Sequence, residues 1–566
     1  MARFWKKTVQ QSPVEFDHIL MDASNVSVLD QERFEGRMEL PIARRSIYYV
    51  GLFFVVVVLW FLYAVFSLQI IEGSTHRFVS ENNSINRGLL IAERGVIYDR
   101  NDVPLAWNEF DPTDRHSFPA RAYIDAMGVG QLLGYVSYPQ KDSSGIYWRT
   151  EYLGRNGVEG VYNDILAGIN GEQIIEVNAL RDVVGEHVVA HATPGQAVSL
   201  SIDVELSQAM YDIIATSSAQ AGFRSGAAAI MDIETGELLA MTSFPSYDPQ
   251  VMADGTPADL IEQWGEDERY PFLNKVVGGV YTPGSVVKPF VSYAALIEGV
   301  VVPETRIVST GEMVIPNPYN PSQPSRFTDW RAHGVMNLRE AIAFSSNVYM
   351  YQISGGFRDQ RGIGITAMHE YFTRFGLGQR SGIALENEQS GVVPNPEWKR
   401  EVFDDAWRLG DTYLTSIGQF GFQSTPLQIL RAYAALANGG YLLTPHVELG
   451  TVGERVDLGL EPSALRVVQE GMRMAVNYDG GTARPLERRD VAIAAKSGTA
   501  EVGAGNAYVN SWVAGYYPYD NPTHAFVLLM DRAPRANQLG ATRVMGDVVE
   551  WMAQNRPEYL GIEVEE

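Results

Sequence analysis

The chain of 566 residues contains no cysteine. This absence excludes disulfides, thiolate catalysis, and zinc or iron–sulfur sites built on cysteine ligands. Tandem repeats and low-complexity segments are also absent from the sequence. The formal net charge is −24 and no basic stripe offsets it, so the composition argues against a nucleic-acid partner. The length predicts several domains, and a hydrophobic content of 46% is enough for large cores.

A long uncharged run stands near the N-terminus. Residues 47–71 carry no formal charge and consist mainly of valine, leucine, phenylalanine and tyrosine. As a helix they would reach ~37 Å, which is enough to cross ~30 Å of hydrocarbon with some tilt. The apolar core of a cleaved signal peptide is shorter. The run therefore predicts a single transmembrane helix at residues 46–71.

The charges beside this run predict its orientation. Arg44 and Arg45 precede it, and Glu72 follows it. The positive-inside rule then places residues 1–45 in the cytoplasm and residues 72–566 outside the membrane. We expect a single-pass protein of the cytoplasmic membrane, in contact with lipid, whose polar tail at residues 1–45 is disordered.

The remainder divides by pattern into two stretches and a tail. Residues 72–220 predict a mostly β module, and residues 221–558 predict an α+β domain that opens with a hairpin at 227–241 and contains an antiparallel sheet. Residues 559–566 are predicted to form an acidic tail. The other predicted strands are residues 96–98, 172–189, 200–203, 491–496, 512–516 and 525–530, and the predicted helices are 285–299, one capped by Asn337, 425–437, 462–476 and 544–554.

One serine and one lysine stand three residues apart where a helix is predicted to begin. Pro283 and Gly284 precede Ser285, and Pro289 fits a helix only near its first turn. Residues at this spacing share a helix face, so Ser285 and Lys288 would be neighbours. A partly buried lysine with a lowered pKa can take the proton of a serine nucleophile. Taken alone, however, such a pair is more typical of a solvated surface.

Two further motifs change that interpretation. Ser345-Ser-Asn347 and Lys496-Ser-Gly-Thr499 follow downstream in that order. Lys496 ends an apolar run, so it is predicted to lie on a strand, whereas Ser345 and Asn347 are predicted on a loop after a helix. The order SxxK, SxN and K(S/T)G is the signature of penicillin-binding proteins and serine β-lactamases.

With these motifs in place, the chain resembles the class B penicillin-binding proteins, which are monofunctional peptidoglycan D,D-transpeptidases. Residues 94–101 and 154–171 match the family's pedestal signatures, and residues 417–440 match its transpeptidase core. Residues 391–412 are similar to those of the elongation branch, penicillin-binding protein 2. The resemblance covers about residues 45–555 and implies a dimerisation-like pedestal followed by a penicillin-binding transpeptidase domain.

The sequence departs from the family pattern at three places. Asp102 stands where the pedestal motif often has glycine. Phe420-Gly421 replaces the usual glycine-first order. Ser497 replaces the commoner threonine, which keeps the hydroxyl group.

The resemblance implies five catalytic residues. Ser285 is expected to attack the carbonyl between the two terminal D-Ala residues of a stem peptide, and Lys288 to take its proton. Ser345 would pass a proton to the leaving amine, with Lys496 tuning that relay. Asn347 would hold Lys288 and the substrate amide.

The resemblance also implies how substrate is held. Ser497, Gly498 and Thr499 are expected to bind the terminal carboxylate, because hydroxyl groups donate hydrogen bonds to carboxylates. The backbone N–H groups of Ser285 and Thr499 would form the oxyanion hole. No metal or other cofactor is expected. The implied partners are peptidoglycan stem peptides, β-lactam antibiotics and a RodA-like membrane glycan polymerase of the SEDS family, during cell-wall elongation.

Two other classes of function share parts of this pattern. A membrane-anchored β-lactamase or D,D-carboxypeptidase would resolve the acyl-enzyme with water, and a non-catalytic scaffold would only regulate a glycan polymerase. A deacylating base would favour the first. Four carboxylates between the second and third motifs are interpreted instead as exposed loop charges: Glu386, Glu388, Asp404 and Asp405. His187 and His191 are interpreted as strand residues without a metal.

Overall fold

The computed structural model describes residues 44–74, 76–77, 85–110, 118–143, 147–177, 183–317, 320, 322–537 and 539–562. Residues 1–43 of the predicted tail and the last four residues of the predicted acidic end lie outside this range. Tyr559 and Leu560, which were also assigned to the acidic end, lie in the short 3-10 helix η7 (Pro557–Leu560), where Leu560 is buried.

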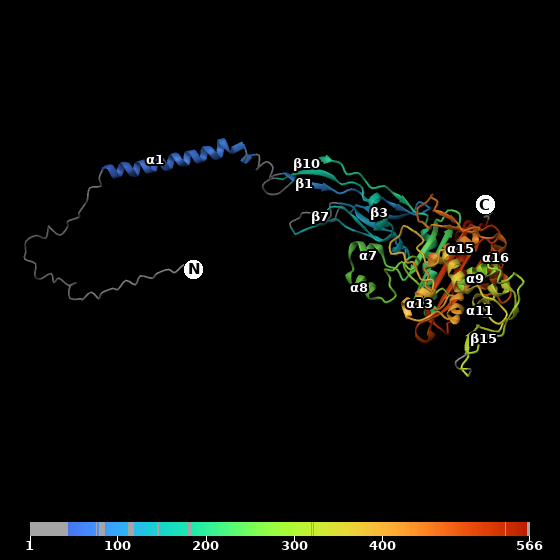
Figure 1. Cartoon of the computed structure of the whole chain (residues 1–566). Coiled ribbons are helices and arrows are strands. Elements are labelled where there is room, and N and C mark those ends of the chain that lie inside the picture. Colours follow the sequence, from blue (N-terminus) through green and yellow to red (C-terminus); the bar gives the residue numbers. More distant parts are fainter. Residues whose placement is uncertain are drawn as a thin grey trace, which may run out of the picture. The chain divides into compact units, whose positions relative to one another are not determined.

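The uncharged run forms one continuous helical segment (Figure 1). Helix α1 (Arg44–Phe66) continues as a π-helical turn, η3 (Ser67–Ile71). The segment Arg45–Ile71 is long and apolar enough to cross a membrane, and its most apolar stretch buries none of its side chains in the protein. The exposed apolar surface is consistent with a lipid-facing anchor.

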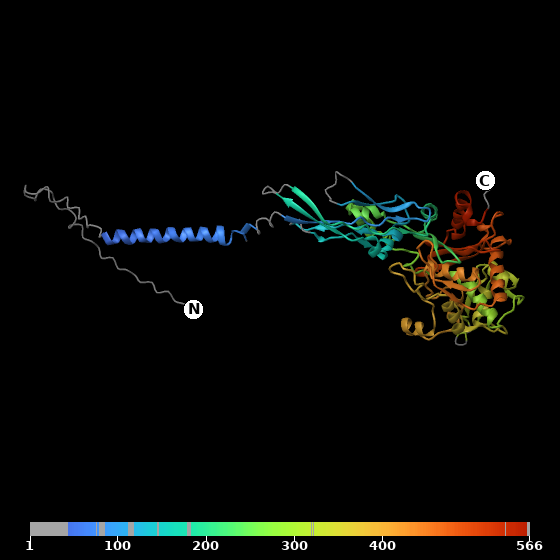
Figure 2. The same ribbon diagram turned by 90° about the horizontal axis from the view of Figure 1, so that it is seen from above.

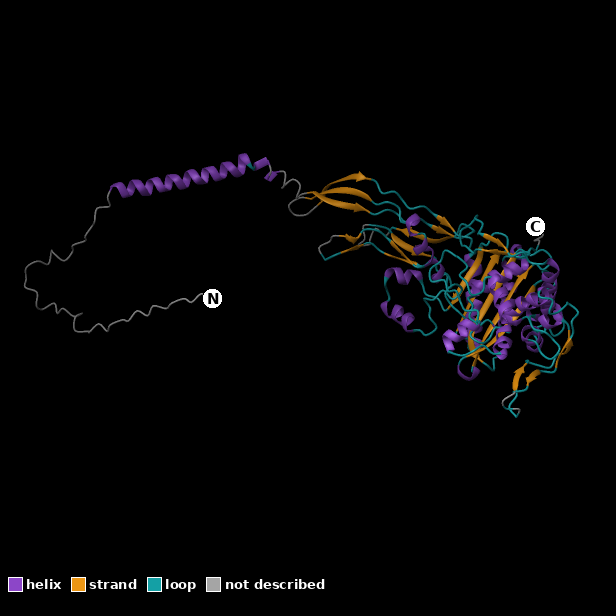
Figure 3. Ribbon diagram, viewed as in Figure 1, coloured by secondary structure: helices purple, strands orange, loops and turns teal. Residues whose placement is uncertain are grey.

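The part of the chain before residue 200 is built from small sheets (Figure 3). One has the order β1-β9-β10 and another the order β11-β2-β3-β4. The pairs β5–β8 and β6–β7 and the short helices α3, α4 and α5 complete the described residues between β1 and β11. The bounds are β1 Ile85–Leu90, β2 Ile97–Tyr98, β3 Pro104–Glu109, β4 Ala120–Tyr123, α3 Gly130–Leu133, β5 Tyr135–Ser137, β6 Gln140–Lys141, β7 Tyr147–Arg149, β8 Leu153–Arg155, α4 Gly157–Val161, α5 Asn163–Leu166, β9 Gly171–Val177, β10 Val183–Ala190 and β11 Val198–Ser199.

A buried ion-pair triad ties three of these segments together. Glu159 in α4 accepts from Arg94 Nε at 2.6 Å and from Arg121 Nε at 2.8 Å. All three side chains are fully buried. Arg94 precedes β2 in the first pedestal signature, Arg121 lies in β4, and Glu159 belongs to the second signature. The Glu159 carboxylate therefore joins the first signature to the second.

The C-terminal part is organised on a five-stranded antiparallel sheet. Its order is β13-β12-β22-β21-β20, with bounds β12 Ser225–Asp232, β13 Leu238–Phe244, β20 Ala494–Val502, β21 Tyr508–Tyr517 and β22 His524–Pro534. Alternate side chains of β12 point to opposite faces. Ala227 and Ala229 join a core with α9 and α15, whereas Ala228 and Ile230 join a core with α6 and α17. In Figure 2 α17, drawn in red, lies on the other side of this part from the yellow helices. The α+β fold class is confirmed.

The helices of this part have the following bounds: α6 Val204–Ala221, α7 Pro249–Asp254, α8 Ala258–Glu266, α9 Lys288–Ile297, α10 Leu338–Ala343, α11 Asn347–Gly355, α12 Gly364–Arg374, α13 Pro396–Phe403, α14 Leu409–Ser416, α15 Pro426–Ala437, α16 Pro462–Asn477 and α17 Ala541–Asn555. Short strands pair as β14 Ile307–Ser309 with β17 Gly334–Met336, β15 Glu312–Ile315 with β16 Ser325–Thr328, and β18 Tyr441–Leu443 with β19 Arg455–Asp457. The predicted capping of α10 by Asn337 is confirmed as a reciprocal capping box with Glu340.

Helix α6 was not predicted. It packs against β13, β12 and α17, although it lies before the boundary predicted at residue 221. The strand predicted at residues 200–203 is wrong, because β11 ends at Ser199 and Asp203 caps α6 by accepting from Leu206 N at 2.9 Å.

The Asp203 carboxylate also meets two distant parts of the chain. Its other oxygen accepts from Asn101 Nδ2 at 3.1 Å, from Tyr559 Oη at 2.8 Å and from Arg556 Nε at 3.1 Å. Burial would raise the pKa of this carboxyl group, but the hydrogen bonds outweigh burial and lower it. One charged group therefore joins the turn after β2, the start of α6 and the C-terminal η7.

Candidate active site

Ser285 lies in a single 3-10 turn, η4 (Gly284–Val287), that leads directly into α9. This confirms the prediction that a helix begins close to Ser285. Gly284 has φ +60°, and a Cβ there would lie 3.0 Å from the carbonyl oxygen of Thr499. Glycine adopts this backbone without strain and leaves room for the close approach, which brings the nucleophile turn against strand β20.

Lys288 is completely buried beside the second motif. Its Nζ donates to the carbonyl oxygen of Ser345 at 2.6 Å, to Asn347 Oδ1 at 2.7 Å and to Ser345 Oγ at 3.3 Å. Burial lowers the pKa of Lys288 to about 7, against the opposing effect of the Asp329 carboxylate. A lysine in this state is partly neutral near neutral pH, as a proton acceptor must be.

The structure corrects the position of the second motif. Asn347 was predicted on a loop, but it is the first residue of α11, whose N-cap is Ser346 accepting from Tyr349 N at 3.3 Å. Ser345 lies just before the cap with φ +58°, a left-handed conformation that costs about 1–2 kcal/mol for a non-glycine residue. The turn aims both the carbonyl and the hydroxyl of Ser345 at Lys288.

An aspartate that the sequence analysis missed holds this turn. Asp329 Oδ1 accepts from the backbone N–H groups of Trp330 and Asn347, each at 3.0 Å. Asp329 Oδ2 accepts from Ser346 Oγ at 2.7 Å, from Val348 N at 3.1 Å and from Ser309 Oγ at 3.1 Å.

Five donors on one carboxylate explain both the turn and the ionisation of Asp329. Burial would raise its pKa, but the hydrogen bonds from Ser346, Asn347 and Val348 lower it below the ordinary value. Asp329 therefore stays ionised and orients the start of α11. No motif spacing marked this residue. Its only sequence signal is an acid beside Trp330, directly after the short strand β16.

The third motif lies on β20, as predicted. Lys496 is fully buried and donates to the carbonyl oxygen of Ser497 at 2.9 Å. Burial and then the charge of Lys288 lower the pKa of Lys496 well below its ordinary value. Ser497 Oγ donates to Thr482 Oγ1 at 2.7 Å, which holds the hydroxyl at the cleft wall. A Cβ at Gly498 would lie 2.9 Å from the carbonyl oxygen of Pro283, so this glycine allows β20 to pass the nucleophile turn.

A cleft of about 680 Å³ brings the three motifs together. Six of the predicted site residues line it, and the two lysines lie buried beside it. Those lining the cleft are Ser285, Ser345, Asn347, Ser497, Gly498 and Thr499.

Phe420 also lines the cleft, at one of the departures from the family pattern. It has φ +59°, in a region that favours glycine, and Gly421 follows with φ +77°. Aromatic side chains of Trp398, Phe403 and Trp407 pack around its ring, at centroid distances of 6.0, 6.5 and 5.6 Å. This packing offsets the backbone strain of about 1–2 kcal/mol.

The interpretation of Glu388 as an exposed loop charge is wrong. Glu388 is buried, and its carboxylate accepts from the backbone N–H and the hydroxyl of Ser381, each at 2.5 Å, and from Gly382 N at 3.2 Å. It does not line the cleft. The Glu388 carboxylate therefore stabilises the turn at Ser381 and Gly382 and lies away from the catalytic cleft.

The family is shown by comparison with known domains. A model of the penicillin-binding protein transpeptidase domain matches residues 226–550. The chain belongs to this family. A model of the penicillin-binding protein dimerisation domain matches residues 115–200.

Individual relatives agree with this assignment. The peptidoglycan D,D-transpeptidase MrdA of Haemophilus influenzae is 30% identical, over 73% of this chain and 66% of the relative. The Escherichia coli protein of the same name is 27% identical, over 84% of this chain and 89% of the relative. Among solved structures, penicillin-binding protein 2 of Pseudomonas aeruginosa superposes with a TM-score of 0.67 at 29% identity, covering 84% of this chain and 99% of that one.

These relatives make the chain a class B penicillin-binding protein of the elongation type, a serine-type peptidoglycan D,D-transpeptidase. They do not favour the β-lactamase, carboxypeptidase or scaffold alternatives. A further structure, entitled "Structural coordination of polymerization and crosslinking by a peptidoglycan synthase complex", superposes with a TM-score of 0.70 at 26% identity and covers 92% of this chain and 99% of its own.

Proposed function

We propose that Ser285 carries the acyl group in this transpeptidase and that neutral Lys288 is its general base. The observation that carries the proposal is the burial of Lys288 against Ser345 and Asn347, one helical turn from Ser285. Ser285 Oγ attacks the carbonyl of the penultimate D-Ala while Lys288 Nζ takes its proton. The ester forms, and the amide bond to the terminal D-Ala breaks.

The leaving amine needs a proton, and Ser345 is placed to relay one. Its hydroxyl accepts from Lys288 at 3.3 Å, so a proton can pass from the protonated Lys288 through Ser345 to the amine. Lys496 lies near enough to tune this relay, because a charge on either lysine disfavours a charge on the other. An amine of a neighbouring stem peptide then attacks the ester, and the steps run in reverse to free Ser285.

Two groups of donors are assigned to substrate. The hydroxyl of Thr499 and that of Ser497, which turns from Thr482 when substrate is bound, donate to the terminal carboxylate. The N–H groups of Ser285 and Thr499 stabilise the oxyanion, a contribution of about 3 kcal/mol per donor.

The same site predicts a long-lived β-lactam adduct. Among the described residues that line the cleft, Glu501 is the one carboxylate, and it is engaged by Arg535 at 2.6 Å and by Asn506 at 2.8 Å. A carboxylate held in this way is poorly available to activate water on the acyl-serine.

We also propose a membrane arrangement and a partner. Residues 1–45 lie in the cytoplasm, residues 46–71 cross the membrane, residues 72–220 form the pedestal and residues 221–558 form the transpeptidase domain. The similarity to a structure of a peptidoglycan synthase complex supports a RodA-like glycan polymerase as the partner of the anchor and the pedestal. Pedestal substitutions that abolish polymerase stimulation while penicillin labelling persists would support this pairing, and unchanged stimulation would contradict it.

Intact-mass measurement after a penicillin pulse tests the catalytic proposal. The full chain is expected to gain one adduct that persists for many minutes, and Ser285→Ala is expected to gain none. An adduct that clears within seconds would indicate a β-lactamase, and an adduct that survives in Ser285→Ala would assign the acyl group to another residue.

A further inference from the structure

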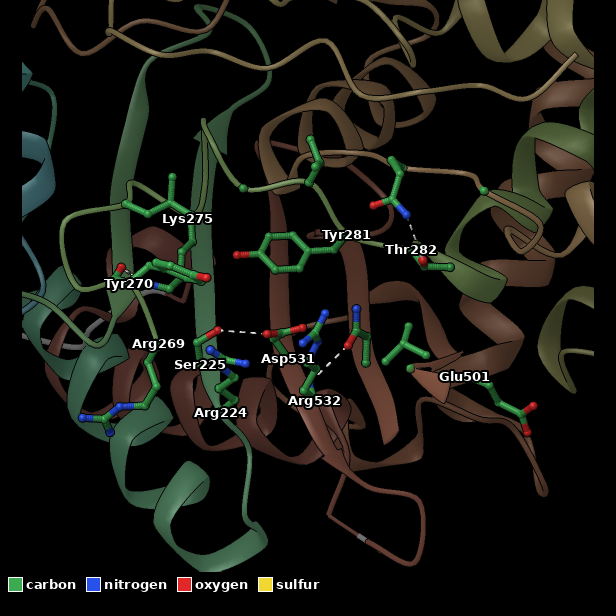
Figure 4. A pocket seen from close by; sticks show the side chains of 18 of the residues that line it. Arg224, Ser225, Arg269, Tyr270, Lys275, Tyr281, Thr282, Glu501, Asp531 and Arg532 are labelled. Carbon is green, nitrogen blue, oxygen red and sulfur yellow. Dashed lines mark hydrogen bonds between the residues drawn. The ribbon is translucent and has the colours of Figure 1, made fainter. Parts of the chain in front are cut away.

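A second cavity adjoins the active-site cleft. It has a volume of about 630 Å³ and lies beyond Tyr281 and Thr282, the residues that lead into the nucleophile turn. Figure 4 shows the Tyr281 ring projecting into it, with the hydroxyl toward Tyr270 and Lys275. Four residues line both spaces and form their common rim: Gln419, Phe420, Glu501 and Asn506.

The charge of this cavity is opposite to that of the chain. Four cationic side chains line it, against the two carboxylates of Glu501 and Asp531. The chain as a whole carries a net charge of −24. A cationic cavity in so acidic a protein attracts anions selectively. The four cations are those of Arg224, Arg269, Lys275 and Arg532.

The four cations differ in how they are paired. Arg269 is neutralised by Asp267 at 2.6 Å. Arg224 donates to the carbonyl oxygen of Glu268 and lies 3.5 Å from its exposed carboxylate. Lys275 is buried and donates to the carbonyl oxygen of Tyr270 at 2.8 Å. Among the described residues, none accepts a hydrogen bond from the guanidinium of Arg532.

The buried Asp531 lies among these cations, as Figure 4 shows. It accepts from Ser225 Oγ at 3.2 Å and is 8% exposed. Burial lowers the pKa of Lys275 to about 7 and raises the pKa of Asp531. Arg224 and Arg532 are therefore the permanently charged groups of the cavity wall that are available to an anionic ligand.

The proposed binding direction leads the substrate into this cavity. If the terminal carboxylate lies at Ser497 and the scissile carbonyl at Ser285, the preceding residues of the peptide extend along β20 toward its C-terminal end at Val502. That end carries Glu501, on the common rim.

We propose that this cavity binds a carboxylate group of the donor stem peptide, upstream of its terminal D-Ala–D-Ala, through Arg224 and Arg532 with Lys275 at its floor. The inference rests on the proposed function of Ser285, and it adds a specificity subsite to it. The subsite selects donors that carry a carboxylate in this upstream segment.

A competition experiment tests the subsite without requiring turnover. Two peptides ending in D-Ala–D-Ala, identical except that the upstream carboxylates of one are converted to carboxamides, compete with a fluorescent penicillin for Ser285 in the detergent-solubilised full chain. The wild type is expected to bind the carboxylate peptide at least tenfold more tightly. The double variant Arg224→Gln/Arg532→Asn is expected to lose this preference. Asparagine suits position 532 because it tolerates the φ of +55° there.

The control variant is Arg489→Gln, which removes one positive charge from an exposed position outside the cavity. It is expected to keep the preference. The inhibition constant of each peptide is compared with the rate at which penicillin alone acylates the same variant. Normal acylation shows that the active site of that variant is folded.

The remaining outcomes separate the proposals. A wild type without a preference, or a double variant that keeps it, would overturn the subsite. If the double variant kept the normal donor preference but had a raised KM for the amine acceptor, the donor subsite would be overturned in favour of an acceptor site. Failure to release D-Ala from either peptide, with the competition preference intact, would overturn the proposed acyl transfer by Ser285 and leave the subsite standing.

Discussion

The pH dependence of Ser285 acylation tests the proposed base. Lys288 must be neutral to take a proton, so the rate depends on the fraction of its amine that is deprotonated. Asp329 faces it and favours the ammonium form. Lys496 lies beside it, with its own pKa lowered by burial and by the charge of Lys288, and His333 lies behind Asp329. Burial sets the balance and brings the pKa of Lys288 to about 7.

This value fixes the size of the effect. At pH 7.5 a group with a pKa of about 7 is roughly three-quarters neutral, whereas an ordinary lysine with a pKa of ~10.4 is about one-thousandth neutral. Because Lys288 accepts a proton only in its neutral form, the acylation rate increases as the pH rises through its pKa. We expect the acylation rate to rise about tenfold per pH unit from pH 5 to 6.5 and to level off above pH 8.

Stopped-flow labelling of the full chain with a fluorescent penicillin from pH 5 to 9.5 measures this profile. Lys288→Arg serves as the control, because a guanidinium stays protonated throughout and is expected to abolish labelling at every pH. A rate that keeps rising tenfold per unit beyond pH 9 would mean an ordinary lysine. A flat profile, or labelling retained in Lys288→Arg, would refute Lys288 as the base.

Three further substitutions have predictable outcomes. Asp329→Asn places an amide donor against the N–H of either Asn347 or Val348; we expect acylation by penicillin to fall at least tenfold and stability to fall by about 2 kcal/mol, measured by labelling and urea unfolding. Glu159→Gln leaves two buried arginines without a counter-charge and is expected to cost about 3–5 kcal/mol in urea unfolding. At Asp102, which has φ +60°, alanine is expected to be about 1 kcal/mol less stable than glycine in the same measurement.

Matched controls keep these results interpretable. Asp359→Asn and Glu172→Gln remove the same charges at exposed positions and are expected to change stability by less than about 0.5 kcal/mol. Normal acylation in Asp329→Asn would mean that the second motif holds its position without this carboxylate. Equal stabilities of the alanine and glycine variants at 102 would mean that the turn relaxes to relieve the strain.

The sequence predicts elements whose signals are local. Pro426 after Thr425 and the glycines after Asn438 bound α15, and alternation around a short turn places the β12–β13 hairpin. Helix α6 had a local signal too, since Asp203 caps its start and Gly222 ends it. The apolar alternation of residues 200–203 predicts a strand instead, so the helix start at Asp203 is not predicted.

What the sequence cannot predict depends on contacts between distant segments. The pKa of Lys288 results from burial that only the packed domain creates. Asp329 reaches the second motif from the loop after β16, and Glu388 accepts hydrogen bonds from Ser381, seven residues earlier. The start of α11 at Asn347 was missed because the motif was taken as a loop, although Ser346 is a good capping residue.

The contacts of Asp203 have a mechanical consequence. A single carboxylate receives Asn101 from the pedestal turn and Arg556 and Tyr559 from the far end of the chain, while it also caps α6. Helices α6 and α17 pack together on one face of the five-stranded sheet. A displacement of the pedestal turn is therefore transmitted to both helices through Asp203. The pedestal turn is therefore linked to the helices behind the catalytic sheet through residues that do not line the cleft, although α17 itself reaches the cleft at Thr542.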